Sequence, residues 1–88
     1  MQSGSQFARH IVAFARREAW GEAAHLYETA LRLAPGNAQA WYTLGNAYAH
    51  SGLSDAALRA YDRCLSLEAG HNAARHNREI VAEDLKAA

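Results

Sequence analysis

The sequence predicts an all-α fold, a right-handed α-solenoid of antiparallel helix pairs with five helices. The first observation behind this prediction is a repeat with a period of 34 residues, in which Phe7, Phe14, Ala23, Tyr27, Ala30 and Pro35 recur as Trp41, Tyr48, Ala57, Tyr61, Cys64 and Ala69. A fixed period of this length is typical of helical repeats, whose units bury their apolar faces by stacking. The second observation is composition, because six glycines and one proline in 88 residues favour close-packed helices over sheets or disorder.

The first predicted helix covers residues 5–17. Phe7, Ile11 and Phe14 lie there at spacings of four and three, which places them on one helix face. A turn over residues 18–21 is expected to follow, since a glycine interrupts the pattern at its end.

The second predicted helix covers residues 22–34 and ends at Pro35-Gly36-Asn37. Proline cannot continue the hydrogen-bond ladder of a helix, and glycine frees the backbone for a turn. The asparagine is a suitable N-cap for the next helix. These three residues therefore separate two helix pairs.

The third predicted helix covers residues 38–51 and ends at Ser51-Gly52. Ser54 is expected to cap the fourth helix, which continues to about residue 68. The turn at 69–71 repeats the earlier one, with Ala69 in place of proline, and a fifth helix follows over residues 72–86.

The fifth helix has a narrower apolar stripe than the others, formed by Ala74, Ile80, Val81 and Leu85. Terminal units of helical stacks need a polar outer face, so this helix is predicted to cap the stack. The expected organisation is a flexible N-terminus at 1–4, a first unit at 5–37, a second unit at 38–71 and a capping helix at 72–88.

Charge and cysteine content exclude several classes of protein. The formal net charge is zero, so nothing draws the whole chain to nucleic acid or to an anionic membrane. Cys64 is the only cysteine, which excludes an intramolecular disulfide, and we expect its thiol to be a small buried packing group. The apolar residues never form a run long enough for a signal peptide or a membrane span. The expected location is cytoplasmic for the chain as it stands, and open if the chain belongs to a longer protein.

The five histidines do not form a pattern that predicts a metal site. His10 stands at a core position, while His25 and His50 fall on different helices. His71 and His76 are five residues apart, which is a poor spacing for two ligands on one helix face. We expect no metal, no cofactor and no catalysis, because the sequence also lacks paired carboxylates, a nucleophile with a base and a phosphate-binding loop.

The aromatic residues of the repeat are predicted to be core residues rather than a platform for stacking bases, because no basic residues interleave with them. These residues are Trp20, Tyr27, Trp41, Tyr48 and Tyr61.

The second unit resembles the tetratricopeptide repeat (TPR) family. It reads Trp41-x-x-Leu44-Gly45-x-x-Tyr48, followed by Ala57-x-x-x-Tyr61. The first unit departs from the family pattern, with His10 and Ile11 where leucine and glycine are usual. Residues 72–77 look like the capping segments of bacterial TPR proteins. The resemblance covers about residues 4–71 together with the capping helix.

The resemblance implies a non-enzymatic module for protein–protein interaction that binds a partner peptide or helix in a concave groove. The groove positions that it implies are Arg9, Val12, Arg16, Gln39, Tyr42, Thr43, Asn46, His50, His76, Asn77 and Ile80. Two arginines seven residues apart can hold a carboxylate, or they can simply form a solvated helix face. Asn46 can contact a ligand or serve the scaffold.

The alternative function is homo-oligomerisation, or assembly within a larger bacterial protein. Phe7, Ile11 and Phe14 would then form an incompletely covered apolar surface at the end of the first helix pair. Weak self-association is accordingly possible beside an unidentified protein partner, while nucleic-acid binding and membrane insertion are not expected.

Overall fold

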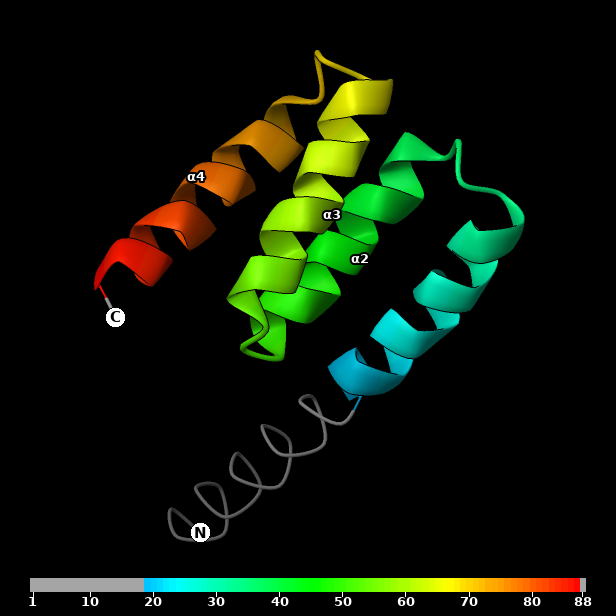
Figure 1. Ribbon diagram of the computed structural model, residues 1–88, viewed down its shortest axis with the longest axis horizontal. Helices are drawn as coiled ribbons and strands as arrows, with labels where there is room; N and C mark the ends of the chain where they lie inside the picture. Colours follow the sequence, from blue (N-terminus) through cyan, green and yellow to red (C-terminus); the bar gives the residue numbers. More distant parts are fainter. Residues whose placement is uncertain (1–18, 88) are drawn as a thin grey trace, which may run out of the picture.

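The computed structural model describes residues 19–87, which form helices and turns only. An unlabelled helix over residues 19–33 is followed by α2 (Ala38–His50), α3 (Ser54–Leu67) and α4 (Asn72–Ala87) (Figure 1). The all-α prediction is confirmed for this part of the chain. The predicted helix over 5–17 and the groove residues Arg9, Val12 and Arg16 lie outside the described residues, as do Phe7, His10, Ile11 and Phe14.

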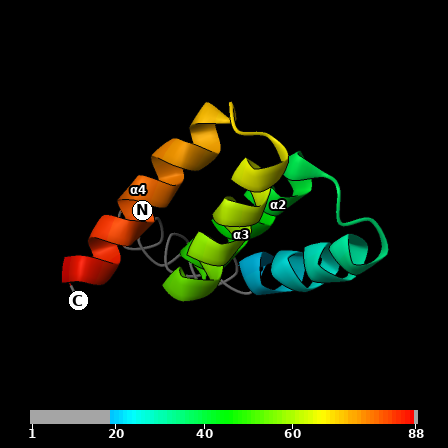
Figure 2. The same cartoon turned by 45° about the horizontal axis from the view of Figure 1, so that its top comes forward.

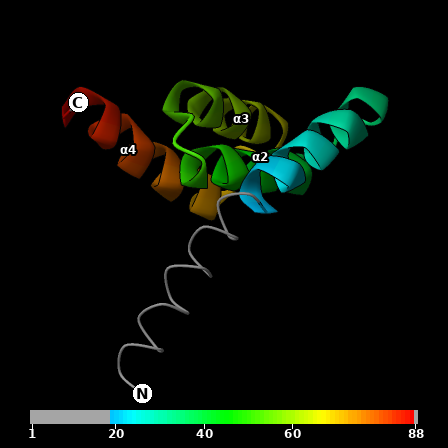
Figure 3. The same ribbon diagram turned by 90° about the horizontal axis from the view of Figure 1, so that it is seen from below.

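Successive helices run in opposite directions and are joined by short turns. Helix 19–33 and α4 lie on opposite sides of the α2–α3 pair, as Figures 2 and 3 show from two directions. α3 contacts both α2 and α4, and α2 also contacts α4. No helix within residues 19–87 is both long enough and apolar enough to cross a bilayer.

The turn predicted at residues 18–21 is wrong for residues 19–21, which already belong to the helix. Gly21 was expected to interrupt the helix, yet its cost inside a helix is only about 1 kcal/mol relative to alanine. The packing of Ala24 and Leu31 into the core outweighs that local preference, because both side chains are buried.

The start of α2 follows the prediction. Asn37 has extended dihedral angles, and its Oδ1 accepts a hydrogen bond from the Ala40 N–H at 3.0 Å. The helix ends at His50, and Gly52 makes the turn to α3 with a φ of 82°. That conformation is the left-handed one that glycine adopts without strain.

The predicted cap of α3 is wrong by one residue. Ser54 is the first helical residue, Leu53 occupies the cap position, and no side chain caps this end. The Leu53 N–H instead donates to the Tyr48 carbonyl at 2.9 Å, which fixes the turn through the backbone. α4 confirms the expected fifth helix, but only part of its predicted apolar stripe is covered. Ala74 and Val81 are buried, whereas Ile80 is 48% exposed.

Two clusters of buried residues hold the helices together. The first core lies between helix 19–33, α2 and α3, and contains Ala24, Leu31, Leu44, Ala47 and Ala60. The second core lies between α2, α3 and α4 and contains Ala57, Tyr61, Cys64, Ala74 and Val81. Most of these residues are small, so the helices approach closely.

The aromatic residues of the repeat pack against these cores, as predicted, but to different extents. Tyr61 is fully buried, whereas the other four are only half-buried: Trp20, Tyr27, Trp41 and Tyr48. Gly45 makes the Tyr61 position possible, because a Cβ at residue 45 would lie 2.5 Å from the Tyr61 ring. Cys64 is completely buried, as expected for a packing residue.

Candidate functional site

A polar network joins α2 to α4 at the centre of the predicted groove. The Asn77 Nδ2 of α4 donates to the Asn46 Oδ1 of α2 at 3.0 Å and to the Tyr42 hydroxyl at 3.4 Å. The Tyr61 hydroxyl of α3 donates to the same Asn46 oxygen at 2.6 Å. The Asn46 carbonyl oxygen therefore serves the scaffold, while its amide N–H groups have no hydrogen-bond partner within residues 19–87.

The buried position of Tyr61 keeps its hydroxyl a neutral donor. The pKa of Tyr61 is raised to about 12, chiefly by desolvation; the nearby Asn77 side chain acts in the opposite direction, and the neighbouring Tyr42 contributes to the rise. At neutral pH the phenol is thus protonated and can hold the Asn46 oxygen.

His71 extends this network at the beginning of α4. Its Nδ1 accepts from the Ala74 N–H at 3.1 Å, so in the neutral ring the proton resides on Nε2. Nε2 can then donate to the Gln39 Oε1, which lies 3.0 Å away. The His71 ring also packs against Tyr42, with 4.7 Å between the ring centroids. One imidazole thus caps α4 and orients two groove residues of α2.

Sequence reasoning missed the role of His71, although the signal was present. His71 stands 34 residues after Asn37, the residue that caps α2. A repeat position that provides a cap in one unit is a good candidate for the same role in the next.

The remaining groove candidates are placed less closely together. Thr43 donates its hydroxyl to the Gln39 carbonyl one turn earlier at 3.0 Å. His76 and Ile80 are exposed on α4. His50 does not touch the Asn46 network; its ring stacks on Trp20 of helix 19–33 at 4.5 Å and 12°. The structure therefore brings together Gln39, Tyr42, Asn46 and Asn77, whereas His50, one turn after Asn46 on α2, contacts Trp20 instead of this network.

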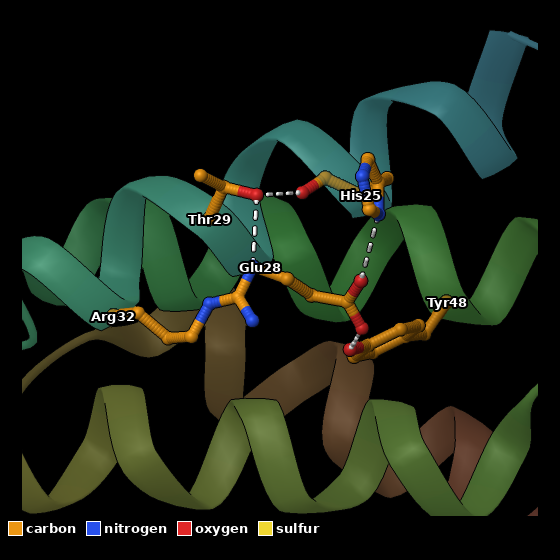
Figure 4. Close-up of polar contacts among 5 residues, drawn as sticks. All are labelled: His25, Glu28, Thr29, Arg32 and Tyr48. Atoms are coloured by element: carbon orange, nitrogen blue, oxygen red, sulfur yellow. Dashed lines mark hydrogen bonds and ion pairs between the residues drawn. The ribbon is translucent and has the colours of Figure 1, made fainter.

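A second polar group joins helix 19–33 to α2, and sequence reasoning missed it. The Tyr48 hydroxyl donates to the Glu28 carboxylate, whose other oxygen lies 3.9 Å from the His25 Nδ1 (Figure 4). Thr29 accepts from Arg32 at 3.1 Å and donates to the His25 carbonyl at 3.1 Å. Burial raises the pKa of Tyr48 to about 12, and Glu28 adds to the shift by accepting its hydrogen bond and by its negative charge.

The described residues offer no group of three potential metal ligands among their histidine, cysteine, aspartate and glutamate side chains. Burial also raises the pKa of the Cys64 thiol, which makes a thiolate less accessible.

The family model for the tetratricopeptide repeat matches residues 15–77, which is more than half of the chain. A search of curated protein sequences returned no match. The match spans helix 19–33, α2, α3 and the beginning of α4, the same elements that the 34-residue period relates to one another. The chain belongs to the tetratricopeptide repeat family.

Proposed function

We propose that this chain is a protein-interaction module that holds an extended peptide, or a helix of a partner protein, in the groove formed by α2 and α4. Tetratricopeptide repeats generally mediate protein–protein interactions, and the family is typically a non-enzymatic scaffold. The proposed organisation is a right-handed stack of two units, 5–37 and 38–71, closed by the helix at 72–88. The contact residues that we propose within the described part are Gln39, Tyr42, Thr43, Asn46, His50, His76, Asn77 and Ile80.

The observation that carries this proposal is the position of Asn77. By donating to both Asn46 and Tyr42, it fixes the relative position of the two helices that face the ligand. A preorganised surface loses little conformational entropy on binding, so most of the ordering cost falls on the peptide. The Asn46 amide can then donate to a peptide carbonyl.

Ile80 supplies the apolar part of the surface. It lies one turn after Asn77 on α4 and is 48% exposed, while His76 is exposed on the same helix. An apolar side chain of the partner can cover Ile80 while its backbone meets the amides. The groove is short, so we expect an affinity of about micromolar.

The test begins with a peptide selected from a random displayed library on the immobilised protein. Calorimetry then compares the native chain with a variant carrying His76→Ala and Ile80→Ala, two exposed positions whose truncation leaves both cores intact. We expect the dissociation constant to rise about tenfold. Asp55→Ala, on an exposed part of α3, is the matched control. Equal affinity in all three proteins would contradict the proposed groove.

Self-association is a second candidate function, and exposure on helix 19–33 favours it. Leu26 is 69% exposed and Leu33 is 86% exposed. Leu67, which is 48% exposed, stands 34 residues after Leu33 and offers a matched control. If this helix face associates, Leu26→Gln with Leu33→Gln will shift the sedimentation equilibrium toward monomer, and Leu67→Gln will not. A monomeric native chain at high concentration would exclude this function.

A further inference from the structure

A cleft runs along the side of α2 that faces away from the Asn46 network. Helix 19–33 forms one wall and α3 the other, with Trp41, Leu44 and Tyr48 of α2 between them. Figure 4 shows part of this region, with Glu28 of helix 19–33 reaching Tyr48 and Arg32 turned toward Thr29. The spacing of these α2 residues places them about opposite to Tyr42 and Asn46 on the helix. The cleft is therefore a surface distinct from the proposed groove.

Three arginines line this cleft. Arg32 lies on the helix 19–33 wall, and Arg59 and Arg63 lie on the α3 wall. None of the three takes part in an ion pair with another residue in 19–87. Within residues 19–87, Arg32 donates to the Thr29 hydroxyl alone, and the guanidinium of Arg63 lies 5.7 Å from the centre of the Trp41 ring.

The two acidic residues of the cleft already have partners. Asp62 pairs with Arg78 of α4, which lies outside the cleft. Glu28 accepts a hydrogen bond from Tyr48 and lies beside His25. The chain as a whole has no net charge, yet this surface presents three guanidinium groups against one carboxylate, that of Glu28, because Asp62 is paired with Arg78. The local imbalance indicates an acidic ligand.

The cleft floor adds an apolar component to this charge. Trp41 is half-buried and Leu44 is buried beneath the cleft, so a ligand meets an aromatic surface between the arginines. The contact with Trp41 restrains the Arg63 guanidinium at the edge, where it can bind a carboxylate in a bidentate manner. A fitting ligand would place anionic groups against the basic walls and an apolar group on the floor. A peptide that alternates acidic and apolar residues has both.

We propose that this cleft is a second binding surface, which takes an acidic segment of a partner protein. Carboxylates of the segment pair with Arg59 and Arg63 on one side and with Arg32 on the other. An apolar side chain of the segment lies on Trp41. The proposal goes beyond the groove between α2 and α4 and does not depend on it.

The test is a nuclear magnetic resonance titration of the full chain with a short acetylated peptide of glutamates surrounding two leucines. We expect shifts in the Trp41 indole N–H and in the Nε signals of Arg59 and Arg63. The side-chain amides of Asn46 and Asn77 should remain unchanged. The same peptide with glutamine in place of glutamate should not bind, and added salt should weaken the binding of the acidic form.

Variants locate the interaction. Arg59→Gln combined with Arg63→Gln should weaken binding about tenfold or more. Arg75→Gln combined with Lys86→Gln removes the same charge from α4 and should leave binding unchanged. Unfolding midpoints of both variants verify that they fold.

The proposal would be overturned if the acidic peptide did not bind, if the glutamine peptide bound equally well, or if the two double variants bound equally well. Tighter binding of a single-stranded oligonucleotide than of the acidic peptide would also overturn it. Shifts confined to the Asn46 and Asn77 amides would also reject the cleft, while supporting the groove. The two proposals can therefore fail separately.

Discussion

The inner junction, where helix 19–33 meets α2, and the outer junction, where α3 meets α4, use equivalent positions with different side chains. At the inner junction the Trp41 indole N–H donates to the Pro35 carbonyl at 2.7 Å. Thirty-four residues later, Arg75 donates to the Ala69 carbonyl. An arginine thus makes the contact that a tryptophan makes in the preceding unit, and both side chains hold the turn before their helix.

The acidic position of the repeat shows the same relation. Glu28 accepts from Tyr48 at the inner junction, and its equivalent Asp62 pairs with Arg78 at the outer junction. Arg78 stands at the position equivalent to Leu44, which is buried. α4 therefore contacts α3 through a polar side chain at a position where α2 buries an apolar one.

The largest expected effect is the difference in stability loss between truncating Tyr61, which is fully buried, and truncating Tyr27, its half-buried equivalent. Tyr61→Ala should lower the free energy of unfolding by about 3–5 kcal/mol, because the ring is buried in the second core. Tyr27→Ala, 34 residues earlier, should cost about 1–2 kcal/mol, because that ring is half-buried. Urea denaturation measures both values. Similar losses would show that the two units are covered alike.

The next effect concerns the glycine that admits Tyr61. Gly45→Ala should destabilise the chain by about 1–3 kcal/mol, because the new methyl group would lie 2.5 Å from a buried ring. In an unobstructed helix the same change would stabilise by about 1 kcal/mol. Glu79→Ala is the control at the equivalent, exposed position, and should change stability by less than about 0.5 kcal/mol. Thermal or urea unfolding of the two variants would decide, and a stabilised Gly45→Ala protein would contradict the packing described.

Alkaline pH should weaken both junctions through their tyrosines. The pKa of Tyr48 and the pKa of Tyr61 are each raised from 10.0 to about 12, so the folded chain resists their ionisation. Their contribution to stability is complete below pH 10 and is lost as pH rises from 10 to about 12. The free energy of unfolding, measured across this pH range, should decline. The decline should be smaller in Tyr48→Phe, which cannot ionise at this position. A flat profile up to pH 12 would contradict the raised values.

The smallest expected effect is a difference in salt dependence between two contacts, the Arg78–Asp62 ion pair and the Tyr48–Glu28 hydrogen bond. Arg78→Ala should cost no more than about 1 kcal/mol, because the ion pair with Asp62 is exposed to solvent. High salt should remove most of that loss by screening. The loss caused by Tyr48→Phe should persist in salt, since only Glu28 is charged in that pair. Denaturation at low and high ionic strength makes the comparison, and equal salt responses would contradict it.

The 34-residue period predicted much of the described fold because the period expresses how the helices stack. The period correctly indicated that Cys64 is a buried packing residue, and local turn chemistry correctly indicated the cap at Asn37 and the helix that begins at Asn72. Local signals failed at residues 19–21 and at Ser54, where glycine and serine preferences are weaker than packing and backbone hydrogen bonds.

The site was predicted less completely than the fold. A list of groove positions includes Asn46 and Asn77 but cannot reveal that the two side chains bond to each other. Nor can it reveal that His50 stacks on Trp20, because that contact depends on the angle between two helices. Repeat positions identify which residues share a face, whereas the pairing of polar atoms depends on the distances between faces.

The burial of Cys64 makes the rate of thiol labelling a measure of how often the second core opens. The thiol lies on α3 in the second core with no exposed area, so a thiol reagent can reach it only after the helices that form this core separate. Because the chain has no other cysteine, every labelling event reports that one separation. Labelling faster than global unfolding would show that the second core opens and closes many times in the lifetime of a folded molecule. The helices around Cys64 would then be the part of the described chain that opens before the rest.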